Sequence, residues 1–242
     1  MRRFLFICII LLVAGTACVA IEKNSLEDYA PAKESEEPLQ ELMIGTKAAT
    51  DTRSFLAEVR EITDGDTISI RRLNHSTITE PYIKEKINMK MEQQDGKLSV
   101  RLLAINTPEI TNGKNEPYGF TAKQLVELLV HDNKIRIELD EQALFDKYER
   151  LLGHVYNSDG TSIQNTLLLS GLARVDYIYD DYKYLDTYKE SEEYAKTNKI
   201  GIYSVPDYIN ENGSGFNQNI VEEIEETSLE ELLKQVPGLT IS

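Results

Sequence analysis

An Asp-Gly-Asp turn between two alternating segments is the feature that most constrains the fold of this 242-residue chain. Apolar and polar residues alternate at residues 57–59 and again at residues 67–70, which is the two-residue period of a half-buried β-strand. Asp64, Gly65 and Asp66 lie between these segments, and Asp-Gly is a frequent pair in tight hairpin turns. The folded part of the chain therefore begins with an antiparallel hairpin.

More strands and helices follow this hairpin. Strand patterns occupy residues 98–105, 134–139 and 152–156, and helical spacing occupies residues 121–131, 162–170 and 182–196. This order indicates a mainly β domain with α-helices, an α+β fold in which a small closed barrel is capped by about three helices.

The segment between residues 73 and 97 is an insertion with its own pattern. Apolar and charged side chains alternate over residues 83–91, so we expect two longer strands that extend the hairpin. Lys84, Lys86 and Lys90 in this segment either contact a substrate or form a solvated face.

Three ordered blocks carry the chemistry. They are Thr-Asp-Gly-Asp-Thr at residues 63–67, Arg-Leu-Leu-Ala-Ile-Asn-Thr-Pro-Glu at residues 101–109, and Asp-Lys-Tyr-Glu-Arg at residues 146–150. Together they supply oxygen ligands for a hard cation, a carboxylate base and two guanidinium groups, which metal-assisted cleavage of a phosphodiester requires. The set resembles the staphylococcal nuclease (thermonuclease-like) family, over about residues 55–204. This resemblance implies a five-stranded OB-fold barrel.

The resemblance also implies a calcium site whose ligands are Asp66, Asn106 and the backbone carbonyl of Thr107. The alternative for Asp66 is a role in the hairpin turn alone. The family has Asp where this chain has Asn106, and calcium affinity depends on the number of charged ligands, so we expect weaker binding. A zinc site is not expected, because the three histidines are scattered and both cysteines lie in the N-terminal segment.

Three catalytic side chains follow from the same resemblance. Glu109 would act as the base that activates water, and Arg101 and Arg150 would bind the phosphate through their planar, two-pronged guanidinium groups. Glu149 stands where the family usually has glycine, so it can pair with Arg150 or change the local turn.

Tyr148, Tyr177 and Tyr179 match aromatic positions of the family's nucleotide pocket, where they would stack on bases or bind phosphate. Placement in the core is the alternative for Tyr179. The implied activity is hydrolysis of DNA and RNA, with single strands preferred, by a monomer that leaves 3′-phosphate ends. The alternative is a catalytically weak nucleic-acid-binding module, and a third interpretation is a surface lipoprotein whose acidic tail recruits a partner.

The N-terminal segment predicts export. Arg2 and Arg3 precede the apolar residues 4–14, as in a secretory signal. We expect either a signal peptide over residues 1–20 or a lipoprotein signal over residues 1–17 with Cys18 lipidated. The protein would then be secreted, or anchored to the outer face of the membrane. A disordered acidic linker (21–52), the nuclease-like domain (53–205) and an acidic tail with a short helix (206–242) would follow.

The net charge of −15 argues at first against a nucleic-acid partner, but the position of the charges along the chain weakens that argument. Residues 22–52 carry a net charge of −5 and residues 206–242 one of −7, so most of the excess lies in the flanks. Residues 53–205 carry −5, and for this mildly acidic domain we expect weak non-specific affinity for nucleic acid and dependence on a cation.

Overall fold

The computed structural model describes residues 53–242, apart from residues 211–212, 214, 218–223, 237 and 240–242. The expected signal (1–20) and acidic linker (21–52) lie outside the described residues. Within the described part of the chain, no helix combines the length and the apolar character that crossing a bilayer requires.

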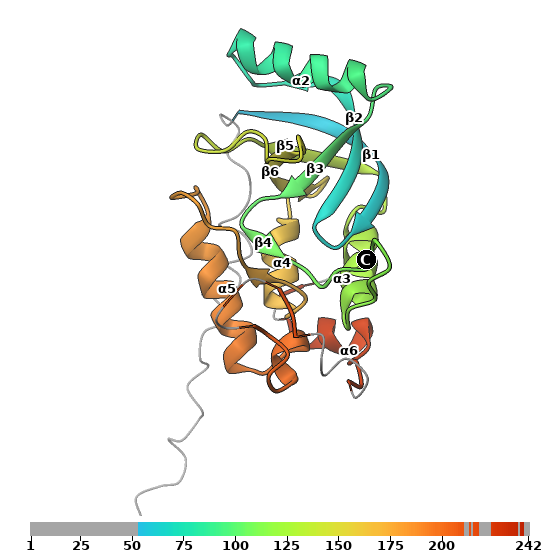
Figure 1. Ribbon diagram of the computed structural model, residues 1–242, viewed down its shortest axis with the longest axis vertical. Coiled ribbons are helices and arrows are strands. Elements are labelled where there is room, and N and C mark those ends of the chain that lie inside the picture. Colours follow the sequence, from blue (N-terminus) through green and yellow to red (C-terminus); the bar gives the residue numbers. More distant parts are fainter. Residues whose placement is uncertain (1–52, 211–212, 214, 218–223, 237, 240–242) are drawn as a thin grey trace, which may run out of the picture. The chain divides into compact units, whose positions relative to one another are not determined.

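Five strands close into a barrel in the order β1-β2-β3-β6-β5 (Figure 1). Their bounds are Ser54–Asp64 (β1), Thr67–Ser76 (β2), Leu98–Leu102 (β3), Lys134–Glu138 (β5) and Leu151–Asn157 (β6). Strands β3 and β6 run parallel, and the other neighbouring pairs are antiparallel. A separate two-stranded sheet joins β4 (Ile105–Asn106) to β7 (Arg174–Val175). The predicted α+β fold with a five-stranded barrel is confirmed.

The alternating pattern of the first hairpin fills the barrel interior. Ala57 and Val59 of β1 are buried together with Ile68 and Ile70 of β2, and Val59 lies directly opposite Ile70. The register of β1 against β2 shifts at three places. Such irregularities increase strand twist, which a small closed barrel requires.

The three expected helices are present as α3 (Gly119–Leu129), α4 (Ile163–Leu169) and α5 (Leu185–Thr197). They lie next to one another below the barrel in Figure 1. All seven residues of α4 are buried, and the Ser162 hydroxyl caps this helix by accepting a hydrogen bond from the Asn165 N–H at 3.2 Å. A 3₁₀-helix, η1 (Gly201–Ser204), follows α5.

The described part of the C-terminal tail packs on these helices. Helix α6 (Leu229–Lys234) buries Leu232 against the core. Beside it, the N–H of Thr227 donates to the Tyr118 hydroxyl at 3.2 Å, and the Tyr194 hydroxyl donates to the carbonyl of Gln235 at 3.0 Å. The described tail segment therefore contacts Tyr118, at the start of α3, and Tyr194, within α5.

The expectation of two extra strands between residues 73 and 97 is wrong, because this segment forms the helix α2 (Pro81–Gln93). Pro81 begins the helix, where its missing N–H costs nothing. Ile83, Ile87 and Met91 are buried at a four-residue spacing, whereas Met89 is 46% exposed. The alternation of apolar and polar residues over 83–91 therefore does not reflect a strand, and the four-residue spacing of the buried side chains is the pattern that matches the structure. With α2 and α6, the described residues hold more helices than the expected three.

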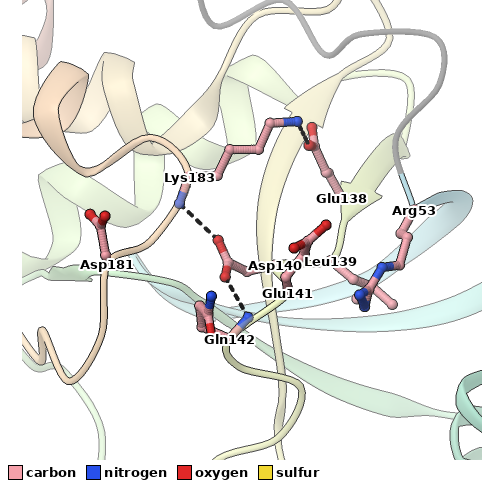
Figure 2. Close-up of a pocket in the computed structure, with 8 residues that line it drawn as sticks. All are labelled: Arg53, Glu138, Leu139, Asp140, Glu141, Gln142, Asp181 and Lys183. Atoms are coloured by element: carbon pink, nitrogen blue, oxygen red, sulfur yellow. Dashed lines mark hydrogen bonds and ion pairs between the residues drawn. The ribbon is translucent and has the colours of Figure 1, made fainter.

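A buried polar network ties β5 to the segment before α5. Asp140 accepts hydrogen bonds from the N–H groups of Gln142 (2.8 Å) and Lys183 (2.9 Å), and its Oδ2 lies 3.2 Å from Nε2 of His154. The Lys183 Nζ also pairs with Glu138 at 2.5 Å. Figure 2 shows Glu138, Asp140, Gln142 and Lys183 of this network beside a cavity, whose volume is about 430 Å³. The residues that line it are Arg53, Glu138, Leu139, Asp140, Glu141, Gln142, Asp181 and Lys183.

Burial alone would raise the pKa of Asp140, but the hydrogen bonds from His154, Lys183 and Gln142 outweigh it and lower the pKa to about 2. A carboxyl whose pKa is lower in the folded than in the unfolded chain stabilises the fold above its unfolded pKa. That contribution is lost as the pH falls through the folded value.

We expect Ile87→Ala to lower the free energy of unfolding by about 2–5 kcal/mol, because it leaves a cavity under α2. The matched change Met89→Ala should cost less than about 0.5 kcal/mol, because its side chain is exposed. Urea denaturation measures both. Residues 87 and 89 would share a face in a strand, so equal losses would contradict the helix.

On going from pH 7 to pH 2, the free energy of unfolding of the wild-type chain should fall by about 2 kcal/mol more than that of Asp140→Asn. The reason is that only the wild type has to protonate this carboxylate. Denaturant midpoints at several pH values, with most of the difference arising below about pH 4, would test this. Asp159→Asn, in an exposed turn, serves as the control. Parallel pH profiles for all three proteins would refute the assignment.

Candidate active site

The first two sequence blocks meet in a buried ion pair. Asp66 lies in the turn between β1 and β2, and Arg101 lies on β3, directly opposite Thr67. Nη1 of Arg101 pairs with Oδ1 of Asp66, and both residues are less than a tenth exposed. Nη2 of Arg101 donates to the carbonyl of Ile105 at 3.0 Å and to Oδ1 of Asn106 at 3.2 Å. One guanidinium thus connects the hairpin turn to the start of the second loop.

Burial, and next the positive charge of Arg150, lower the pKa of Arg101 to about 10. The guanidinium still carries its charge at neutral pH. Because a buried cation is costly without a partner, the Asp66 carboxylate is a structural requirement of the site as well as a candidate metal ligand.

Thr107 packs directly on the hairpin turn. Its N–H donates to Oδ2 of Asp66 at 2.8 Å. A Cβ atom at Gly65 would lie 2.8 Å from Cγ2 of Thr107 and 2.7 Å from Cβ of Ala122. The close approach of the loop, rather than a left-handed backbone, is therefore what requires glycine in the Asp-Gly-Asp turn.

Glu109 is held by the loop that follows it. Its Oε1 accepts hydrogen bonds from the N–H of Thr111, at 2.8 Å, and from the Thr111 hydroxyl. Its own N–H donates to Oε2 of Glu116 at 2.8 Å. Burial would raise the pKa of Glu109, but the two bonds from Thr111 outweigh it and lower the pKa. The carboxylate is therefore ionised at neutral pH, as a general base must be.

The negative charge of Glu109 acts on a second carboxyl. Burial, and next this charge, raise the pKa of Asp64 to about 6. Burial is thus the main reason that the ionised form of Asp64 is disfavoured, and a cation bound nearby would favour that form.

The third block reaches the same place through Arg150. Asp146 holds this residue by accepting hydrogen bonds from its N–H (2.9 Å) and its Nε (2.7 Å). Nη1 of Arg150 lies 3.5 Å from Oγ1 of Thr67, which in turn donates to Oδ1 of Asp66 at 3.1 Å. All three sequence blocks are therefore joined by direct contacts.

The turn before Arg150 has an unexpected support. Glu149 has a φ of 66°, in the left-handed region that favours glycine. Its carboxylate pairs with Nζ of Lys90 at 2.5 Å, so α2 contacts the edge of the site. The sequence pattern predicts that Lys90 either contacts a substrate or lies on a solvated face, and no local signal links it to a residue 59 positions away.

Two of the three expected tyrosines lie against the arginines. The Tyr177 ring centroid is 5.6 Å from Cζ of Arg101, and that of Tyr148 is 5.5 Å from Cζ of Arg150. Both rings are more than a third exposed and so remain open to a ligand. Tyr179 is 81% exposed, which excludes the alternative of a core position, and the described ring contacts do not join it to either arginine.

A polar pocket of about 290 Å³ opens beside these groups. It is lined by Asn106, Thr107, Glu109, Lys114, Glu116, Tyr177, Gly215 and Phe216. Lys114, Glu116 and Phe216 were not among the site residues expected from the sequence. The positions of Lys114 and Glu116 in the loop after the Thr-Pro-Glu block could have pointed to them. No sequence signal pointed to Phe216, which lies about 110 residues after that block.

The donor atoms at the site fit a hard divalent cation, because the side chains of Asp66 and Asn106 and the backbone of Thr107 offer only oxygen. The buried hydroxyl of Thr107 has no hydrogen-bond partner among the described residues, so an oxygen is available there too. No cluster of three or more His, Cys, Asp or Glu side chains suited to a metal occurs in the described ranges. The expected set is of another kind, since it includes an amide and a carbonyl.

Comparison with known proteins gives consistent matches. A family model described as "Staphylococcal nuclease homologue" matches residues 99–205. The chain is 43% identical to the SPbeta prophage-derived endonuclease YokF of Bacillus subtilis (strain 168), over 48% of this chain and 40% of that protein. It is 42% identical to endonuclease YncB of the same strain, over 48% of this chain and 56% of the relative. A thermonuclease of Staphylococcus intermedius is 27% identical over 65% of this chain and 81% of its own. The chain thus spans about half the length of the two Bacillus relatives.

We expect Asp66→Asn to lower the free energy of unfolding by about 3–5 kcal/mol, because Arg101 keeps a buried charge without its partner. Denaturation with a chelator present measures this loss apart from any metal binding. Asp64→Asn is the control, since it removes a carboxylate whose ionisation burial opposes, and it should not destabilise the fold near pH 7. Equal losses in the two variants would contradict a specific ion pair.

Proposed function

We propose that this chain, which through residues 99–205 is a member of the staphylococcal nuclease homologue family, is a calcium-dependent nuclease of DNA and RNA. The observation that carries the proposal is the convergence of the three sequence blocks. Asp66, Arg101 and Arg150 are linked through direct contacts, and Asn106, Thr107 and Glu109 line the polar pocket beside them. This is the combination that phosphodiester hydrolysis requires.

In this proposal, Asp66, Asn106 and the carbonyl of Thr107 hold the cation. Calcium bound there would neutralise part of the negative charge of the reacting phosphate. Asn106 contributes a dipole and no charge, so the affinity should be lower than that of a site with two carboxylates. The amide oxygen of Asn106 also accepts a hydrogen bond from Arg101, which aligns it with the site.

Glu109 is the proposed general base. A water oxygen attacks phosphorus while its proton passes to the Glu109 carboxylate. The bond from phosphorus to the 5′-oxygen breaks, and this oxygen leaves with the bonding electrons and takes up a proton from solvent, which gives a 3′-phosphate and a 5′-hydroxyl. The lowered pKa of Glu109 keeps the carboxylate ready to accept this proton at neutral pH. Thr111 holds it in a defined orientation, which reduces the entropy cost of the step.

Arg101 and Arg150 are the proposed phosphate ligands. Each offers several N–H donors in one plane, and each uses only part of that set within the protein. Charge that develops on the phosphate oxygens in the transition state would be stabilised by both. Tyr148 and Tyr177 present exposed rings beside these arginines for stacking on neighbouring bases, and Tyr179 is a further candidate.

A preference for single strands, a monomeric state and export remain part of the proposal. The size of the pocket supports the first, since about 290 Å³ is near the lower end of the ~300–1,000 Å³ typical of small-ligand sites. In this proposal, a pocket of this size takes a single unpaired nucleotide in preference to a base pair. Secretion or lipid anchoring at Cys18 depends on the N-terminal residues, outside the described part of the chain.

Cleavage assays on the purified full chain test the enzyme. We expect single-stranded DNA and RNA oligonucleotides to be cut with calcium and not with chelator, and Glu109→Gln to reduce the rate about 10²–10⁴-fold through loss of the base. Glu127→Gln, on the exposed face of α3, is the control. End-group analysis should find 3′-phosphates.

Oligonucleotide binding without cleavage at millimolar calcium would contradict the nuclease and favour the catalytically weak binding module. Asn106 and Glu149 would then be the first positions to revert to the family's residues. Activity of Glu109→Gln equal to that of the control would remove Glu109 from the mechanism while leaving the enzyme in place.

A further inference from the structure

Helix α2 lies outside the family match but contacts the edge of the proposed site. The match begins at residue 99, whereas α2 ends at Gln93. In Figure 1, α2 lies above the barrel, away from α3, α4 and α5. It reaches the loop between β5 and β6, because Nζ of Lys90 pairs with Glu149, the residue directly before Arg150. A strand that left the site past Arg150 would therefore meet α2.

A second contact joins the helix to the same loop. Nζ of Lys86 lies 5.0 Å from the ring centroid of Phe145 and 5.8 Å from that of Tyr82. Tyr82, Lys86 and Lys90 are spaced four residues apart, so they follow one side of the helix. At a rise of about 1.5 Å per residue, this side extends over about 12 Å. We refer to these three residues as the α2 strip.

Two cations in this region are left without a carboxylate. Among the described residues, neither Lys86 nor Lys147 forms an ion pair, and Nζ of Lys147 lies instead 5.0 Å from the ring centroid of Tyr148. Glu85 and Glu92, the acidic residues of α2, lie about 100–120° around the helix from Lys86, since successive residues turn by about 100°. The α2 strip and the loop beside it therefore present positive charge that a polyanion can use.

Exposed aromatic rings accompany these cations. Tyr82 is 66% exposed and Tyr148 is 67% exposed. Proteins that bind single-stranded nucleic acid combine positive charge, which follows the phosphate backbone, with aromatic side chains on which unpaired bases stack. Both kinds of side chain occur here, next to a proposed phosphate ligand.

We propose that α2 is an additional binding surface for the substrate strand, on which Lys86 binds a phosphate beyond the one held by Arg101 and Arg150. This inference rests on the proposed function. Lys90 is a positioning residue in it, because its pair with Glu149 holds α2 against the loop. Of the two roles that the sequence left open for the lysines of this segment, Lys86 has that of substrate contact. The partner is an unpaired strand long enough to extend from the pocket to the helix.

The test measures oligonucleotide affinity in the full chain with calcium, in a Glu109→Gln background so that the probe stays intact. Lys86→Gln removes one cation and keeps a flexible polar side chain. We expect the slope of log affinity against log salt for a single-stranded DNA dodecamer to become shallower by about 0.7, the contribution of one phosphate contact. At 0.1 M salt this corresponds to about a five-fold loss of affinity. Lys86→Arg should retain the affinity of the parent.

Probe length separates this surface from the pocket. A dinucleotide, measured by its competition with the dodecamer, should bind Lys86→Gln and its parent equally, because it occupies the pocket without reaching α2. In the catalytically intact chain, Lys86→Gln should raise KM for the dodecamer about five-fold and leave kcat unchanged. A loss of dinucleotide affinity as large as that of the dodecamer would overturn the inference, since the lysine would then act on the pocket itself.

Lys189→Gln is the matched control, because it makes the same change in net charge at an exposed position of α5. Equal losses in the two variants, or an unchanged salt slope for Lys86→Gln in a chain that cleaves, would overturn this inference alone. A wild-type chain that binds the dodecamer with the expected difference between variants but does not cleave it would overturn the nuclease and leave the binding surface. A wild-type chain that neither binds nor cleaves would overturn both.

Discussion

The buried ion pair between Asp66 and Arg101 is the contact on which the rest of the site depends. Neither charge is tolerated away from water without the other, so the pair holds the β1–β2 turn against β3 as the barrel closes. The same two side chains bind the next loop, since Arg101 donates to Ile105 and Asp66 accepts from Thr107. The loop that carries Glu109 therefore starts from a fixed position.

The distribution of charge along the chain is consistent with the proposed site for a polyanion in an acidic protein. The net charge of −15 is concentrated in the flanking segments, whereas Arg101 and Arg150 lie where a phosphate would be bound. Burial and the charge of Glu109 raise the pKa of Asp64 to about 6. A cation at the proposed calcium site would stabilise the ionised form of this carboxyl.

Most of the barrel could be predicted from the sequence, because alternation and turn chemistry act over a few residues. The hairpin around Gly65 and the helices after residues 118 and 162 are of this kind. A local pattern can also mislead, as in the insertion at residues 73–97, where strands were expected and a helix is found. Ile83, Ile87 and Met91 carry the helical spacing of α2, while the exposed Met89 between them produces a local alternation that resembles a strand. Burial, and not the pattern alone, decides between the two.

The sequence by itself determined the candidate reactive groups and their order, since Asp66, Arg101 and Glu109 lie in short blocks whose residue types suit one chemistry. Only the tertiary structure decided which distant residues complete the site. Lys90 pairs with Glu149 in its left-handed turn, and Gly215 and Phe216 line the pocket from beyond the matched region. Contacts between residues far apart in the chain depend on how the elements pack, and packing leaves no local pattern in the sequence at either partner.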